Sequence, residues 1–103
     1  MARLNWTDQS INDLVNIADF IARDSVRYAK ITVGRIRVAA RQLKIYPLSG
    51  RKVPESDIES IREIILGNYR IIYSIISKDK IDILTVHHSA KRLDIEELTK
   101  HLF

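Results

Sequence analysis

Residues 61–86, which read IREIILGNYRIIYSIISKDKIDILTV, decide the fold of this chain. They contain three runs rich in isoleucine, separated by Gly67-Asn68 and by the Ser-Lys-Asp-Lys segment at residues 77–80. Both separators are strong turn signals, and the runs between them have the composition of β-strands. We therefore expect a meander of three antiparallel strands at the centre of the protein.

The middle strand of this meander has two different faces, because successive side chains of a strand point to opposite sides. One face is predicted to hold Tyr69, Ile71, Tyr73 and Ile75, and the other Arg70, Ile72, Ser74 and Ile76. Both faces are largely apolar. Arg70 is the exception, since an unpaired guanidinium in a central strand is costly unless a partner, a cleft or water reaches it.

The size and composition of the chain limit what it can be. With 103 residues, it can form one hydrophobic core but hardly two, so we predict a single domain over residues 1–103. It contains no run of about 18 uninterrupted apolar residues, which argues against a membrane span. The absence of cysteine and of a signal-peptide layout favours the cytoplasm. The net charge of +4 favours an anionic partner, either nucleic acid or an acidic protein.

The residues before the meander predict a short strand and a helical hairpin. Residues 3–6 alternate as an edge strand does, and Thr7 or Asp8 can cap the helix that follows. Asp24-Ser25 offers a break and a second cap, and Pro47 ends the second helix. The apolar faces of the two helices are expected to consist of Ile11, Leu14, Val15, Ala18, Ile21 and Ala22, and of Val26, Ala29, Val33, Ile36, Ala40 and Leu43.

Two basic segments precede the meander in the sequence. A row of cations runs beside the apolar seam of the second helix and consists of Arg27, Lys30, Arg37, Arg41 and Lys44, with Arg35 nearby. Such a row is more typical of a solvated helix flank than of a ligand site. Residues 48–60 are predicted to form a surface loop that holds the pair Arg51-Lys52, and loops of this kind often carry function.

The order of these elements predicts an α+β fold, with an N-terminal strand, a two-helix hairpin packed on a small, mostly antiparallel sheet, and a C-terminal helix. That last helix is expected from Asp94 to about Leu102, with Asp94 as its cap. The hairpin covers one face of the sheet, and the other face must be shielded by the tail or offered to a partner. If it is open, Arg70, Ile72 and Ile76 would make it a concave binding surface with a positive centre.

Several motifs follow one another in a recognisable order. They are Trp6-Thr7, Ile-Asn-Asp-Leu at residues 11–14, Tyr-Pro-Leu-Ser-Gly-Arg at 46–51, Ile-Arg-Glu at 61–63, Gly-Asn-Tyr-Arg-Ile-Ile-Tyr at 67–73 and Ile-Leu-Thr-Val-His-His at 83–88. In this order the chain resembles the RelE/ParE superfamily of type II toxin-antitoxin toxins over nearly its whole length. The resemblance implies a small basic protein that stops growth, with a cognate antitoxin as its partner.

Two toxic mechanisms follow from the resemblance. A RelE-like toxin cuts mRNA on the ribosome, and Arg70 would then hold the phosphate while His87 or His88 acts as acid or base. Only one of these histidines is expected beside Arg70, because neighbours on a strand point to opposite faces. The RNA backbone would be neutralised by Arg51, Lys52 and Arg62. The chain departs from RelE at Ile61 and Glu63, where RelE carries basic residues, and it has no tyrosine after His88.

A ParE-like toxin inhibits DNA gyrase without a hydrolytic site of its own, and we favour this interpretation. The strand end at residues 85–87, followed by a C-terminal helix, fits the ParE branch better. Recognition or structural roles would then fall to Arg62, Arg70, Lys91 and Arg92.

A third class, a non-toxic nucleic-acid-binding module, would need base-stacking aromatic residues on the open face of the sheet. Tyr69 and Tyr73 are instead expected on the face away from Arg70. We expect no metal and no cofactor, because two neighbouring histidines and scattered carboxylates form no recognisable ligand set.

Overall fold

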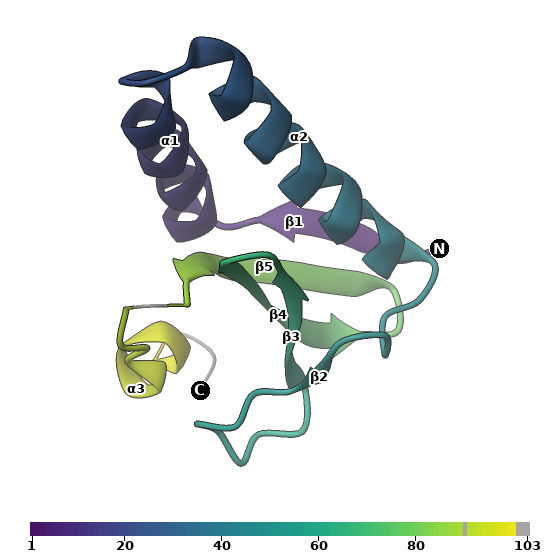
Figure 1. Ribbon diagram of the computed structural model, residues 1–103. Coiled ribbons are helices and arrows are strands. Elements are labelled where there is room, and N and C mark those ends of the chain that lie inside the picture. Colours follow the sequence, from purple (N-terminus) through teal and green to yellow (C-terminus); the bar gives the residue numbers. More distant parts are fainter. Residues whose placement is uncertain (90, 101–103) are drawn as a thin grey trace.

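The computed structural model describes residues 1–89 and 91–100, and the predicted meander lies at its centre (Figure 1). The three strands are β3 (Ile61–Leu66), β4 (Tyr69–Ser77) and β5 (Lys80–His88), and neighbouring strands are antiparallel. Gly67 joins β3 to β4 with a φ of +57°, a conformation that glycine adopts without a steric penalty. The prediction from residues 61–86 is therefore confirmed.

Two short strands complete the sheet in the order β1-β5-β4-β3-β2. The predicted edge strand β1 (Arg3–Trp6) pairs in parallel with β5, and β2 (Arg51–Lys52) pairs antiparallel with β3. The sheet is thus mostly antiparallel, as expected. The predicted surface loop over residues 48–60 contains a short strand that was not expected, because two of its residues, Arg51 and Lys52, pair with the edge of β3.

The helical hairpin forms between β1 and β2. It consists of α1 (Asp8–Ala22) and α2 (Val26–Arg41), and a short 3₁₀ helix (Gln42–Lys44) extends α2. Both predicted caps are present, since the hydroxyls of Thr7 and Ser25 accept hydrogen bonds from backbone N–H groups in the first turns of α1 and α2.

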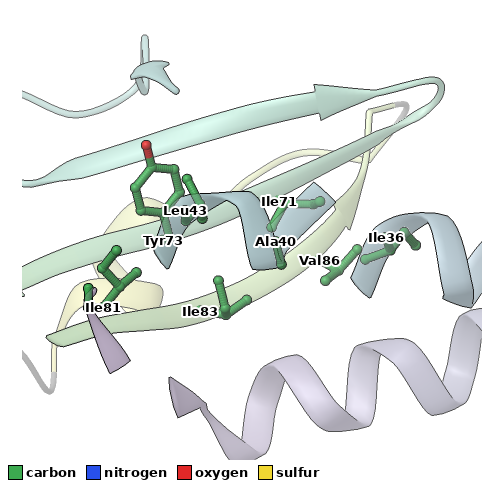
Figure 2. Packing of buried hydrophobic residues seen from close by; sticks show 9 residues of the cluster. Ile36, Ala40, Leu43, Ile71, Tyr73, Ile81, Ile83 and Val86 are labelled. Carbon is green, nitrogen blue, oxygen red and sulfur yellow. The ribbon is translucent and has the colours of Figure 1, made fainter. Parts of the chain in front are cut away.

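The main core lies between the hairpin and the sheet (Figure 2). Its buried residues are Ala2, Ile36, Ala40, Leu43, Ile71, Tyr73, Ile81, Ile83 and Val86. The predicted face of α1 was partly wrong: Ile11 and Val15 are 47% and 52% exposed, whereas Leu14 and Ile17 pack against the core. At the start of α2, Val26 is also exposed, because the tip of the hairpin lies away from the sheet (Figure 1).

The opposite face of the sheet is covered at its centre, although Ile65, opposite Arg70, and Ile76, near the end of β4, are 49% and 45% exposed. A second buried cluster of Val53, Ile61, Ile72 and Leu84 lies on this face. Residues 53–60, here called the strap, contribute Val53 and Ile58, and the C-terminal segment adds Leu93, Ile95 and Leu98. The expectation of an uncovered hollow was therefore wrong. The alternative, that the tail shields this face, holds.

The C-terminal helix α3 (Ile95–Thr99) lies on the opposite side of the sheet from the hairpin (Figure 1). Asp94 caps it as predicted, by accepting a hydrogen bond from the N–H of Glu97 at 3.1 Å. The predicted terminus at Leu102 lies outside the described residues. Within residues 1–89 and 91–100, the helices are too short or too polar to cross a bilayer.

Candidate functional site

Arg70 makes the densest polar contacts on the covered face of the sheet. Its Nε donates to Oε2 of Glu63 at 2.6 Å, and its two terminal nitrogens donate to the two carboxylate oxygens of Glu55 at 2.7 and 2.8 Å. The Nε of Arg51 donates to the other oxygen of Glu63 at 2.8 Å. These four residues, Arg51, Glu55, Glu63 and Arg70, are called the Arg70 cluster below. Two guanidinium groups thus meet two carboxylates, and the formal charge of the cluster is zero.

Strand register brings these side chains together. Arg70 is the cross-strand partner of Ile65, and Glu63 lies two residues before Ile65, so the two charged side chains are diagonal neighbours on one face. Arg51 on β2 lies directly opposite Glu63. The strap then places Glu55 over the outer edge of the guanidinium of Arg70.

Within this cluster, the pair of Glu63 and Arg70 is the more deeply buried. The side chain of Glu63 is fully buried and that of Arg70 is 12% exposed, whereas that of Glu55 is 38% exposed. The hydrogen bond from Arg70 lowers the pKa of Glu55. The hydrogen bond to Glu55, together with that to Glu63, raises the pKa of Arg70 despite the opposing effect of burial. Both charges are therefore held in place, and the expected unpaired positive centre is absent at Arg70.

The two histidines separate as predicted, and only His87 shares the face of Arg70. His87 is the cross-strand partner of Arg70, and its Nε2 lies 2.6 Å from the carbonyl oxygen of Lys91 in a hydrogen bond. His88 makes an edge-to-face contact with the ring of Tyr69 on the other face, with 5.5 Å between the ring centroids. One ring nitrogen of His87 is therefore engaged with the backbone.

The predicted binding residues do not converge on one site. Lys52 pairs with the exposed Glu59 at 3.2 Å. Arg62 lies on the helix side of the sheet, opposite Tyr73, and donates to the carbonyl oxygen of Gly50 at 2.9 Å. The remaining two, Lys91 and Arg92, are exposed in the segment between β5 and α3.

A cleft of about 560 Å³ lies between the start of α1, β5 and α3, and His87 forms part of its wall. Four acidic residues also line it: Asp8, Asp82, Asp94 and Glu97. Such walls repel a phosphate rather than attract it. Over residues 1–89 and 91–100, no three His, Cys, Asp or Glu side chains are grouped so that they could hold a metal ion.

Comparison with known protein families identifies the family to which this chain belongs. The sequence model described as "ParE toxin of type II toxin-antitoxin system, parDE" matches residues 4–93, which is most of the chain. The chain belongs to the ParE toxin family. The predicted membership of the RelE/ParE superfamily is thereby confirmed, and a toxin of a type II system has a cognate antitoxin as its partner.

Individual relatives agree with this assignment. The ParE-family toxin is 38% identical over 89 residues to Y4kP of Sinorhizobium fredii, whose name describes it as a candidate toxin; the alignment covers 84% of this chain and 88% of the relative. A solved structure, "Chromosomal ParDE TA system from P. aeruginosa", superposes with a TM-score of 0.71 at 23% identity. It covers 85% of this chain and 96% of the other, and supports the fold.

Two residues of the ParE-family toxin have roles that sequence reasoning missed. The carboxylate of Asp13 on α1 accepts hydrogen bonds from the hydroxyl of Thr85 and, at 3.0 Å, from the N–H of Val86. Because β1 pairs only with residues 80–83 of β5, this N–H lies beyond the end of the ladder. Asp13 therefore attaches α1 to the free edge of β5.

The second missed residue is Tyr73. Its hydroxyl donates to the carbonyl oxygen of Pro47 at 2.7 Å and accepts from the N–H of Gly50 at 3.0 Å, and burial raises its pKa. The local sequence reveals neither role, because the hydrogen-bond partners are distant along the chain. Those of Asp13 lie 72 and 73 residues from it, and those of Tyr73 lie 23 and 26 residues from it.

Proposed function

We propose that this ParE-family toxin stops growth by inhibiting DNA gyrase and that it has no nuclease centre. The state of Arg70 carries the proposal. Cleavage of RNA needs a positive group that is free to stabilise the phosphate as charge develops on it. Arg70 instead donates to Glu63 on its inner side and to both oxygens of Glu55 on its outer side. A phosphate would have to displace a carboxylate before it could bind.

The surroundings of Arg70 support the same conclusion. The buried carboxylate of Glu63 lies where RelE-like toxins carry a basic residue, and it adds negative charge beneath the site. His87 is bonded to the carbonyl oxygen of Lys91 and borders a cleft with acidic walls. An inhibitor that binds its target without cutting nucleic acid needs neither a free arginine nor a free histidine.

The segment between β5 and α3 is the part of the described chain that we propose for contact with gyrase. Lys91 and Arg92 are exposed there, three and four residues after His88, at the end of β5 that fits the ParE branch. A protein surface can be recognised by such exposed cations without burying them in the toxin's own fold. Gyrase and its DNA lie in the cytoplasm, so the proposal also places the toxin there.

Two assays with the purified protein test the target. In the first, gyrase supercoils a relaxed plasmid, and we expect the toxin to block supercoiling and to increase the amount of cleaved plasmid. In the second, primer extension on ribosome-bound mRNA should show intact message. Cleavage of that mRNA at defined positions, abolished by Arg70→Ala or His87→Ala, would reverse the assignment in favour of a ribosome-dependent endoribonuclease.

A pair of variants tests the proposed surface. Lys91→Glu/Arg92→Glu should reduce gyrase inhibition at least tenfold, which is about 1.4 kcal/mol of binding free energy. Lys78→Glu, which reverses a single charge in the turn at the other end of β5, is the control and should inhibit like the wild type. Equal inhibition by all three proteins would remove residues 91–92 from the interface.

Growth arrest tests the class of protein independently of the target. Expression without the cognate antitoxin should stop cell division, and co-expression of the antitoxin should restore it. Harmless accumulation of the folded protein would contradict toxicity altogether.

A further inference from the structure

The positive charge of the ParE-family toxin is concentrated on α2 and its flanks. Residues 23–44 hold seven Lys and Arg side chains and one acid, Asp24, so their formal charge is +6 in a protein whose total is +4. The rest of the chain is therefore net negative. The arginines of the Arg70 cluster and the proposed gyrase surface lie outside this segment, so neither of them accounts for its charge.

Four of these cations form one row along the helix. Arg27, Lys30, Arg37 and Arg41 lie within about 80° of arc at 3.6 residues per turn, over about 21 Å of helix axis. Lys44 follows them in the 3₁₀ helix. All four are exposed, and α2 itself contains no acidic residue. We call them the α2 cation row.

Within the described part of the chain, no residue of the α2 cation row forms an ion pair. Each ion pair formed there lies elsewhere, on the sheet, the strap or α3. The groove between α1 and α2 brings Lys30 and Arg37 to one wall, and its single acid is Asp19. Like charges at this spacing repel one another, so the row is a cost to the folded toxin unless an anionic ligand binds.

Gly34 lies in the middle of the same row and is exposed. A Cβ added there would meet no atom within 4 Å, so no neighbour inside the toxin requires a glycine. Glycine within a helix costs about 1 kcal/mol relative to alanine. Its missing side chain leaves room for another molecule to approach the helix between Lys30 and Arg37.

We infer that the α2 cation row binds the phosphate backbone of double-stranded DNA. One strand of a duplex presents a phosphate about every 3.4 Å along its axis, so a row of about 21 Å faces enough phosphates for all four side chains. Such contacts carry no sequence preference. An acidic protein segment is the other ligand that opposite charge allows. We favour a duplex because every unit of its backbone carries a charge, so that each of the unevenly spaced cations can reach a phosphate with its long side chain.

Salt dependence of binding to bare DNA tests this inference without gyrase. We would measure fluorescence anisotropy of a labelled 30-base-pair duplex of arbitrary sequence between 50 and 200 mM KCl. Four phosphate contacts predict a slope of about −3.6 for log K against log salt concentration, or a loss of affinity of about 150-fold over this range. Arg37→Gln/Arg41→Gln should halve the slope and leave a loss of only about tenfold.

The matched control is Arg3→Gln/Arg35→Gln, which removes the same charge from exposed positions outside the row. Arg35 is on α2 itself, about 120° around the helix from the centre of the row. This control should keep the wild-type slope. The inference is overturned if both double variants lower the slope equally, which would mean that only net charge matters. It is also overturned if a polyglutamate peptide binds through Arg37 and Arg41 while the duplex does not.

Failure of the gyrase proposal would leave this inference standing, because the duplex assay contains no gyrase. Conversely, a toxin that inhibits gyrase but shows no salt-dependent binding to DNA through α2 would refute the inference alone.

Discussion

Replacement of Glu63 by glutamine tests whether the Arg70 cluster holds the fold together. Glu63→Gln keeps the shape of the side chain and removes its charge between two guanidinium groups. The side chain of Glu63 is fully buried, and Arg70 beneath the strap is 12% exposed. Loss of one partner from a buried ion pair costs about 3–5 kcal/mol, because the other charge stays buried.

The structure reduces this figure in two ways. Glu55 still neutralises Arg70 from outside, and the amide oxygen of glutamine can accept one hydrogen bond. The pair with Arg51 adds little, since that side chain is 63% exposed and exposed pairs contribute about 0–1 kcal/mol. We therefore expect Glu63→Gln to lower the free energy of unfolding by about 2–4 kcal/mol, out of a typical 5–15 kcal/mol for a domain of this kind.

Urea unfolding followed by the fluorescence of Trp6, the single tryptophan, measures this quantity by linear extrapolation. Glu55→Gln is the matched control, because it makes the same change in the exposed partner of Arg70 and should cost less than about 1 kcal/mol. If Glu63→Gln unfolds within about 0.5 kcal/mol of the wild type, or if Glu55→Gln costs as much as Glu63→Gln, the buried pair is not a structural element.

Further predictions concern two glycines, Asp13 and Glu55. Gly50→Ala should lower the free energy of unfolding in urea by about 2 kcal/mol or more, because a Cβ there would lie 2.6 Å from the carbonyl oxygen of Glu63 and from the hydroxyl of Tyr73. Gly34→Ala should instead raise it by up to about 1 kcal/mol, because a Cβ there meets no atom within 4 Å. Asp13→Ala should cost about 1–3 kcal/mol in the same assay and speed hydrogen exchange at Val86, whose N–H loses its acceptor. NMR titration should give Glu55 a pKa below its ordinary value of 4.5. The ion pair of Glu55 therefore stabilises the fold fully above pH 4.5, and this stabilisation is lost as the pH falls through the pKa of the folded state.

The local features of the fold could be predicted because they depend on neighbouring residues. Gly67-Asn68 forms the turn, and Thr7, Ser25 and Asp94 cap helices where the sequence indicated. Each of these features depends on side chains within three or four residues of the backbone group that they satisfy. The apolar face of α1 was harder, because an extended apolar stripe does not reveal which part of it the sheet will cover.

The candidate site could be predicted only in part, because its contacts join distant segments. The alternation of side chains along β4 correctly placed Arg70 on one face of the sheet and Tyr69 and Tyr73 on the other. It could not show that Glu55, 15 residues away, closes the outer edge of Arg70 while Glu63 holds the inner one. Nor could it show that the strap and α3 cover the second face, since this depends on how the tail folds back over the sheet.

The double variant Arg70→Gln/Glu63→Gln tests the central claim most directly, because it removes both buried charges at once. The costly case is a buried charge left without its partner, and this variant leaves none, because both buried charges are replaced and the two amides can hydrogen-bond to each other. We therefore expect the variant to stay folded. If Arg70 serves the fold and the toxin needs no chemistry from it, the folded double variant should inhibit gyrase supercoiling within about threefold of the wild type. A folded double variant that has lost all inhibition of gyrase would contradict this claim, because Arg70 or Glu63 would then be needed for toxicity itself.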